Sequence, residues 1–139
     1  MDTYAEKLIR GIPNKKDFLD DEGRVKQSLF LFSKEPREED GFYDLSINWF
    51  DNEEALSIML TQKKGGEFQF KAGVAIIQRF FLDDLIRRPT SSNELFYERQ
   101  RIPGNDYHGN IICKTKSKER QSLFRANLAM CVVDIIEQL

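Results

Sequence analysis

The sequence predicts an α+β domain in which a mixed or antiparallel sheet is covered by a long C-terminal helix and one or two shorter helices. Two observations support this prediction. Residues 43–50 alternate between apolar and polar side chains, as a half-buried strand does. Residues 117–138 repeat apolar side chains at helical spacing, which predicts one broad buried face. No regular alternation of strands and helices is visible, which disfavours a doubly wound parallel sheet.

The composition indicates one globular domain spanning residues 1–139. Hydrophobic residues make up 40% of the chain and charged residues 32%, a balance that suits a folded protein and argues against disorder. No linker rich in proline, glycine or serine divides it. The eleven phenylalanines are expected to build the core, because phenylalanine packs without needing a hydrogen-bond partner.

Charge and targeting signals bear on where the protein works. A net charge of −2 disfavours a general nucleic-acid binder, which is usually basic. The first residues show no basic-then-apolar signal peptide, and charges interrupt every apolar run before it reaches membrane-spanning length. Cys113 and Cys131 lie far apart and form no paired motif. A reducing cytoplasm without membrane contact is therefore expected.

The first half of the chain predicts two strands and a loop. Residues 14–26 are polar and rich in turn formers, so a surface loop is expected. Residues 27–32 combine aromatic and aliphatic side chains and are expected to form a strand, as are residues 43–50. The charged segment 34–41 between them is expected to be solvated.

A helix is expected to follow the second strand. Asp51 or Asn52 is placed to cap its first turn, and Glu54 stands three residues after Asp51, as a capping box requires. The helix is expected to end at residues 63–66, where two lysines precede two glycines.

The second half of the chain predicts three further strands. Residues 68–80 begin with alternation and continue as an apolar run rich in β-branched residues, which favours a strand. A helix beginning near Ala72 is the alternative, because the same apolar residues also fit helical spacing. Residues 83–88 are expected to form a short helical turn. Strands at 95–102 and 110–114 are expected on either side of a Pro-Gly-Asn-Asp turn.

The candidate chemistry centres on His108, the single histidine of the chain. One histidine excludes two-histidine ribonuclease chemistry and zinc sites of the H-E-x-x-H type. His108 stands in a polar stretch, 105–110, as either a general base oriented by Asp106 or Asn110, or a loop residue bonded to the backbone. The second reading is favoured, because no second catalytic residue of an obvious type accompanies it.

Other common catalytic and cofactor motifs are missing from the sequence. Cys131 falls on the apolar face of the predicted C-terminal helix, and Cys113 follows two isoleucines in a predicted strand. Neither stands at a helix N-terminus, where a thiolate would be stabilised, so a thiol enzyme is disfavoured. The Lys-Lys-Gly-Gly stretch at 63–66 lacks the spacing of a phosphate-binding loop. We therefore expect no cofactor and no metal.

Charge is unevenly distributed along the chain. Residues 34–54 include eight acidic and two basic side chains, whereas residues 85–120 include eight basic and four acidic ones. A solvated surface is the favoured interpretation of this segregation, and the alternative is contact surfaces toward a charged partner or between copies of the protein. Lys114, Lys116 and Lys118 alternate, so they would share one face of a strand. A nucleic-acid contact is the less favoured reading, and its candidates are Arg87, Arg88, Arg99, Arg101, Lys114, Lys116 and Lys118, with Tyr97 and Tyr107 for stacking.

Four short pieces of the chain resemble stretches of small bacterial proteins of unassigned role. They are I-R-G-I-P at 9–13, Gly23 with Ser28 and Phe30, L-S-I at 45–47, and H-G-N-I at 108–111 ahead of the closing helix. The resemblance implies a compact bacterial protein encoded beside other genes of an operon. It also makes Arg10, Ser46 and His108 candidates for a cluster, which would form a small polar pocket if the three residues meet in space.

The sequence favours a non-enzymatic protein-interaction or accessory subunit of a bacterial multi-component system, because a catalytic set is missing while charge is segregated. Another protein subunit is the expected partner, and association of copies is left open. The alternative is a small enzyme or a nucleotide- or nucleic-acid-binding domain, with His108, Arg10 and Ser46 as catalytic candidates. It requires Arg10 and His108 to line one cavity. The residues expected to contact a partner or ligand are Asp106, Tyr107, Asn110, Arg99, Arg101, Lys114 and Lys116.

Overall fold

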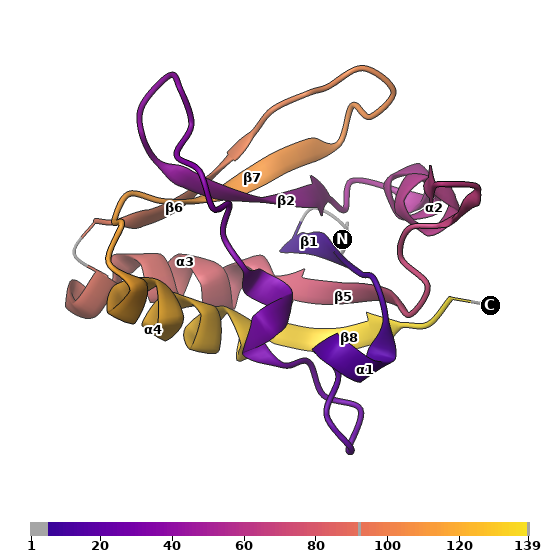
Figure 1. Cartoon of the computed structure of the whole chain (residues 1–139), viewed down its shortest axis with the longest axis horizontal. Coiled ribbons are helices and arrows are strands. Elements are labelled where there is room, and N and C mark those ends of the chain that lie inside the picture. Colours follow the sequence, from indigo (N-terminus) through magenta and orange to yellow (C-terminus); the bar gives the residue numbers. More distant parts are fainter. Residues whose placement is uncertain (1–5, 92, 139) are drawn as a thin grey trace.

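Six strands form one antiparallel sheet through the centre of the molecule (Figure 1). The computed structural model describes residues 6–91 and 93–138. The order of strands across the sheet is β6-β7-β2-β1-β5-β8. Their bounds are β1 (Lys7–Ile12), β2 (Tyr43–Trp49), β5 (Gly73–Gln78), β6 (Leu95–Arg99), β7 (His108–Cys113) and β8 (Val132–Ile136). The fold is therefore α+β with an antiparallel sheet, as the sequence predicts.

Helical segments cover both faces of this sheet. On one face the buried side chains of Leu82, Phe124 and Phe30 join a single apolar core with the strands. The other face is covered at one end, where Ala55 and Met59 form a smaller cluster with strand residues. The helical segments are α1 (Lys15–Phe18), η2 (Gln27–Phe30), α2 (Glu53–Thr61), α3 (Arg79–Arg87), η3 (Pro89–Ser91) and α4 (Lys118–Ala129). Among the described residues no helix is long and apolar enough to cross a membrane.

β1 lies inside the sheet, between β2 and β5, and was not predicted from the sequence. Its residues Leu8, Ile9 and Ile12 are fully buried. Because both faces of a central strand are covered here, apolar side chains occur on successive residues and the period of two is lost. Arg10 is the polar residue in this run, and its role is described below.

β2 confirms the strand predicted at 43–50. It pairs with the whole of β7, from Tyr43 opposite Cys113 to Asn48 opposite His108. Leu45 and Ile47 face the larger core. The prediction is accurate because one face of β2 packs on the larger core while Ser46 on the other face is exposed. The two faces therefore differ in polarity.

Residues 27–32 do not form the predicted strand. Instead η2 is a 3₁₀ turn, with Leu29 and Phe30 buried and packed against α4. Neighbouring buried residues in a short apolar run fit a tight turn as well as a strand, so the pattern could not distinguish them. The expected surface loop at 14–26 holds a single helical turn, α1, capped by the side chain of Asn14.

α2 begins where the sequence predicts, and Asn52 is the residue that caps it. The Asn52 Oδ1 atom accepts a hydrogen bond of 3.1 Å from the amide of Ala55. After α2 the chain turns through Gly65 and Gly66, whose φ angles are 63° and 84°. Two residues at positive φ are what a tight two-residue hairpin requires. The hairpin strands are β3 (Lys63–Lys64) and β4 (Glu67–Phe68).

The strand predicted at 68–80 is too long at both ends. β5 spans Gly73–Gln78 and continues directly into α3, which begins at Arg79. The short helical turn expected at 83–88 is the second half of this helix. Apolar residues continue from β5 into α3, so their spacing in residues 68–85 fits a strand and a helix alike.

The long C-terminal helix predicted at 117–138 is wrong beyond Ala129. α4 ends there, and β8 follows as an edge strand that pairs with β5. Val132, Val133 and Ile135 are β-branched, which favours extended backbone. The predicted apolar stripe still marks the core, because Phe124, Leu128 and Cys131 are buried in it.

Candidate functional site

β2 and β7 bring Ser46 and His108 onto the same face of the sheet. Ser46 lies opposite Asn110, and Asn48 lies opposite His108. Opposed residues share a face of the sheet, and so do alternate residues along a strand, so these four side chains point to one side. Ser46 is exposed and His108 is half-buried, so solvent reaches the pair.

The ring of His108 is held between two partners. Its Nδ1 atom lies 2.9 Å from the backbone carbonyl oxygen of Gln100, and its Nε2 atom lies 3.2 Å from Ser46 Oγ. Because a carbonyl oxygen only accepts, the neutral ring carries its proton on Nδ1, and Nε2 accepts from the Ser46 hydroxyl. A serine that donates to an imidazole has the local geometry of a base-activated nucleophile.

Arg10 reaches Ser46 from the opposite face of the sheet. Its guanidinium donates to the backbone carbonyl of Ser46 at 2.7 Å and to that of Leu29 at 3.0 Å. The ladder between β1 and β2 ends at Ile9 opposite Asn48, so this side chain supplies the next connection between the two strands. Burial lowers the pKa of Arg10 from 12.5 to about 10, which leaves the group charged at neutral pH.

Arg10 and His108 line no shared cavity among the five surface hollows found over residues 6–91 and 93–138. Arg10 contacts the serine backbone, whereas His108 contacts the serine side chain on the other face. The three residues named by the resemblance therefore meet at Ser46, and none of them lines one of these five hollows.

The turn before β7 is tied to the rest of the fold by side chains. Tyr107 Oη donates to Glu54 Oε2 at 3.0 Å and accepts from Asn52 Nδ2 at 3.2 Å, which joins the turn to α2. Asn110 is buried and its Nδ2 atom donates to Gln100 Oε1 at 2.6 Å. Asp106 is exposed. The hydrogen bonds of Tyr107 and Asn110 join residues of the described chain to one another. They therefore support a structural role for this polar turn.

Asn105 has a part in this turn that the sequence did not indicate. Its Nδ2 atom donates to Asn48 Oδ1 at 2.8 Å, and Asn48 in turn donates to the carbonyl of Ala55 at 3.2 Å. Asn48 is buried, so these bonds satisfy its amide inside the sheet-helix layer. The stretch 105–110 gave no signal for this link, because the partner Asn48 lies far away in sequence.

The basic residues predicted to form one surface are dispersed. Lys114 lies over two aromatic rings, with its Nζ atom 5.6 Å from the Phe42 centroid and 5.4 Å from that of Phe96. Lys116 and Lys118 instead line a hollow beside α4. The shared strand face predicted for the three lysines is wrong, because β7 ends before Lys114.

Two guanidinium groups lie over the ring of Trp49, a cluster that the sequence did not reveal. The Arg79 and Arg99 Cζ atoms are 4.7 Å and 4.8 Å from the ring. Arg99 also forms an ion pair with Asp51, while the predicted partner residue Arg101 is simply exposed. These contacts fit a structural role for Arg99, because cation–π pairs stabilise packed surfaces.

The thiols and carboxylates give no sign of a reactive centre. Cys113 and Cys131 are buried, and burial raises the pKa of each thiol to about 11. Both thiols are therefore protonated at neutral pH and are poor nucleophiles. Within the described residues, no three His, Cys, Asp or Glu side chains are grouped so as to hold a metal ion.

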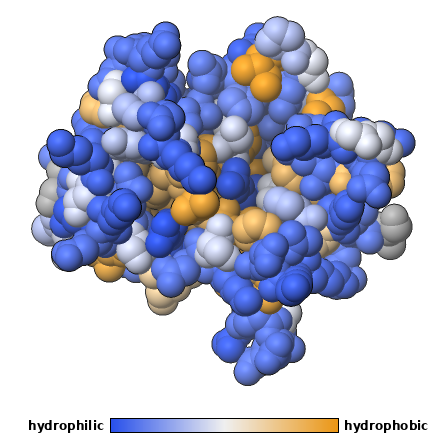
Figure 2. All heavy atoms as spheres, viewed as in Figure 1, coloured by the Kyte–Doolittle hydropathy of each residue, from blue (hydrophilic) through white to orange (hydrophobic). Residues whose placement is uncertain are grey.

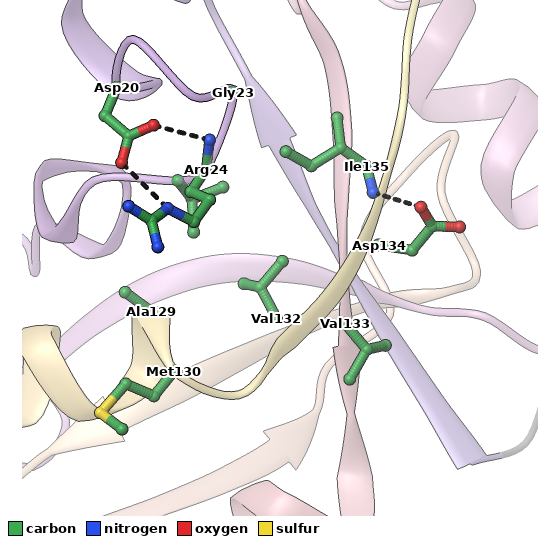
Figure 3. A pocket seen from close by; sticks show the side chains of 10 residues that line it. Asp20, Gly23, Arg24, Ala129, Met130, Val132, Val133, Asp134 and Ile135 are labelled. Carbon is green, nitrogen blue, oxygen red and sulfur yellow. Dashed lines mark hydrogen bonds and ion pairs between the residues drawn. The ribbon is translucent and has the colours of Figure 1, made fainter.

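The edge strand β8 borders the hollow with the largest volume of the five, about 620 Å³, here called the β8 groove (Figure 3). One wall is β8 and the end of α4, where Met130 and Val133 are 80% and 47% exposed. The other wall is the turn at 20–25, in which Asp20 Oδ1 accepts from the amides of Glu22 and Arg24, both at 2.9 Å. These bonds, that of Arg24 first, hold the pKa of Asp20 below its usual value and order the turn.

Asp134 is one of the residues that line the β8 groove, and its side chain binds the backbone beside it. Its Oδ1 atom accepts a hydrogen bond of 2.8 Å from the amide of Ile135, as Figure 3 shows. This bond involves an amide of β8, which is an edge strand of the sheet. In the described residues Asp134 has no ion pair, whereas Asp20 is paired with Arg24.

The chain was compared with models of known protein families, with curated proteins and with solved structures, and none of the three comparisons finds a match.

Proposed function

We propose that this protein is a non-enzymatic accessory subunit of a bacterial, cytoplasmic assembly, and that it binds an extended segment of a partner protein in the β8 groove. The observation that carries the proposal is the coincidence of a sheet edge, a groove and exposed apolar side chains in one place. An edge strand offers unpaired backbone groups to an added strand, and the groove beside it offers side-chain contacts.

The apolar part of the β8 groove supports an interaction role. Met130 and Ala129 at the end of α4, and Val132 and Val133 further along β8, form the apolar part of its lining (Figure 3). Scattered single apolar residues are normal on a surface, whereas a group of them along a strand edge marks a contact site. Figure 2 shows hydrophobic residues gathered at several places on one face of a largely hydrophilic surface, most extensively near its middle.

Charge indicates which partner segment fits. Asp134 is the groove carboxylate without an ion pair in the described chain, so a lysine or arginine of the incoming segment would complement it. Two copies of β8 paired across a two-fold axis would bring two Asp134 carboxylates into the same short ladder, where like charges repel. The proposal is therefore a different protein rather than a second copy.

Affinity purification tests this proposal in the native host. We expect the tagged wild-type chain to recover a stoichiometric partner at low and moderate salt, and we expect V133E to lose at least about 90% of it, because a charge then replaces a buried contact. The partner is identified by mass spectrometry, and binding of its synthetic segment to the purified chain is then measured by calorimetry.

L123E is the matched control. Leu123 is 45% exposed and lies on α4 outside the β8 groove, so the same substitution there changes surface charge alone. Retention of the partner by L123E and its loss from V133E supports the proposal. Recovery of wild-type protein alone, recovery of self-associated copies, or equal loss from both variants contradicts it.

The hydrogen bond between Ser46 and His108 favours a second candidate, a small enzyme with a serine nucleophile. In such an enzyme His108 Nε2 would take the hydroxyl proton while Ser46 Oγ attacks an electrophile. The described hollows do not include either residue, and a hydrolase needs donors placed around the developing oxyanion. The accessory-subunit proposal therefore stands first.

A fluorophosphonate probe distinguishes the two candidates. We expect no label on Ser46, because neither Ser46 nor His108 lines one of the five described hollows, where the probe could be held against the serine. Labelling would join Ser46 Oγ to phosphorus, release fluoride and pass the hydroxyl proton to His108. If intact-mass spectrometry finds this adduct on the wild type and not on S46A or H108Q, the enzyme candidate replaces the first proposal.

A further inference from the structure

A second hollow, of about 490 Å³, lies between α4 and the chain that leaves η2, and is here called the cationic pocket. It gathers residues from three separate parts of the sequence. Those residues are Leu31, Phe32, Ser33, Lys34, Tyr43, Lys116, Lys118, Gln121 and Arg125.

The charge of this lining differs from that of the other hollows. Lysine and arginine supply four of its side chains, and no aspartate or glutamate takes part. Each of the other four hollows includes at least one carboxylate. Four like charges around one concavity repel one another, and low-dielectric walls concentrate their field, so the pocket attracts an anion.

These cations are not neutralised from within the described chain. Lys34, Lys116 and Lys118 form no ion pair with its carboxylates. Arg125 is also without an ion pair, and its Nε atom is buried without a hydrogen-bond partner in the described residues. Arg37, by contrast, is bonded to three carboxylates. A buried guanidinium donor with no acceptor is costly, and a bound anion would remove that cost.

The fold explains why these side chains converge. Lys118, Gln121 and Arg125 stand three and four residues apart, so they lie on one face of α4. Lys118 is the first residue of that helix, whose amide dipoles add positive potential at this end. Lys34 belongs to the loop between η2 and β2. That loop passes beside α4, so Lys34 lines the same pocket as the helix residues.

We infer that the cationic pocket binds a small organic phosphate carrying more than one phosphate charge, of the size of a nucleotide. Its volume falls within the range of small-molecule sites, which suits a compact ligand better than a long strand. Lysine and arginine are the residues that bind phosphate oxygens. Phe32, Tyr43 and Leu31 provide an apolar and aromatic wall for the organic part of the ligand.

Calorimetry with three probes tests this inference. Pyrophosphate carries the charge alone, adenosine carries the organic part alone, and ADP carries both. We expect saturable one-to-one binding of ADP, weaker binding of pyrophosphate, and none of adenosine at about 1 mM. Binding of ADP should weaken between about 50 and 200 mM salt, because the charges are screened.

Four variants locate the binding. K116Q and R125Q are each expected to weaken ADP binding about tenfold, as the loss of one charge-assisted contact does. K34Q removes the charge of an exposed lysine. If R125Q folds poorly, the ADP affinity of K34Q serves as the test in its place. K114Q is the control, because Lys114 lies close to Lys116 in sequence but sits over Phe42 and Phe96 outside the pocket.

Unchanged ADP affinity in K114Q with about tenfold losses in K116Q and K34Q supports the inference. Three results overturn it. They are no saturable binding of ADP or pyrophosphate to the wild type, an equal loss in K114Q, and tighter binding of a dT12 strand than of ADP with all four variants affected alike. The last result would mean that these lysines and arginines belong to a surface that binds nucleic acid.

Discussion

Substitution of Gly73 by alanine is expected to lower the free energy of unfolding by about 2–5 kcal/mol, the sum of backbone strain and steric overlap. Gly73 has a φ of 101°, a conformation that residues with a side chain rarely adopt. A Cβ atom there would overlap the carbonyl oxygen of Ile136 and lie 2.9 Å from the backbone nitrogen of Gln138. The overlap is relieved only if β8 moves away from β5. Urea unfolding followed by circular dichroism measures the loss.

G104A separates the two causes of this loss. Gly104 has a φ of 81°, but no atom lies within 4 Å of the position its Cβ would take. This variant is therefore expected to lose only the cost of backbone strain, about 1–2 kcal/mol. If G73A and G104A lose the same amount, close contact between β5 and β8 does not explain the requirement for glycine at position 73.

Replacing Arg10 with methionine is expected to cost about 2–4 kcal/mol of stability. Methionine keeps most of the side-chain volume but donates no hydrogen bond. The carbonyls of Ser46 and Leu29 then lose the donor that joins β1 to β2 and to η2. A lysine at position 10 would keep the charge but not the fixed fork of donors, so R10K is expected to lose about half as much. Urea unfolding of both variants gives the two values.

R24M provides the matched control for R10M. Arg24 is largely exposed and its pairs with Asp20 and Glu22 are surface ion pairs, which contribute little. Its loss should stay below about 0.5 kcal/mol. Equal stability losses in R10M and R24M would mean that the bonds of Arg10 do not brace the sheet, and its place beside Ser46 would need another explanation.

The parts of the fold that the sequence predicted are those whose two faces differ in polarity. β2 was found because Leu45 and Ile47, which face a core, alternate with the polar residues Asp44, Ser46 and Asn48. β1 was missed because it is apolar on both faces, and β8 was mistaken for helix because its apolar residues continue the stripe of α4. In the last case the β-branched run after Cys131 was the better signal.

The candidate site was predictable only as far as short motifs carry information. Arg10, Ser46 and His108 do come together in the fold. Strand alternation, however, places the side chain of Arg10 on one face of the sheet and those of Ser46 and His108 on the other. The glycines in two of these pieces have structural reasons. A Cβ at Gly109 would lie 2.7 Å from Trp49 Nε1, and one at Gly11 would overlap the ring of Phe70. The sequence indicated only part of the cationic pocket, because Lys116 and Lys118 stand in the basic stretch 85–120 whereas Lys34 and Arg125 join them only in the folded chain.

The order of strands has a consequence for how fast the chain reaches its native state. Lys7 faces Gln78, Tyr43 faces Cys113 and Val74 faces Ile136, so most ladders join segments far apart in sequence. β1, the strand near the middle of the sheet, cannot complete its pairing with β5 until residues beyond Gly73 have been added. Closing such long loops before any contact forms is entropically costly, and sheets of this kind fold in milliseconds to seconds. During synthesis the apolar residues of β1 therefore stay exposed longest, and that interval is when aggregation threatens the protein most.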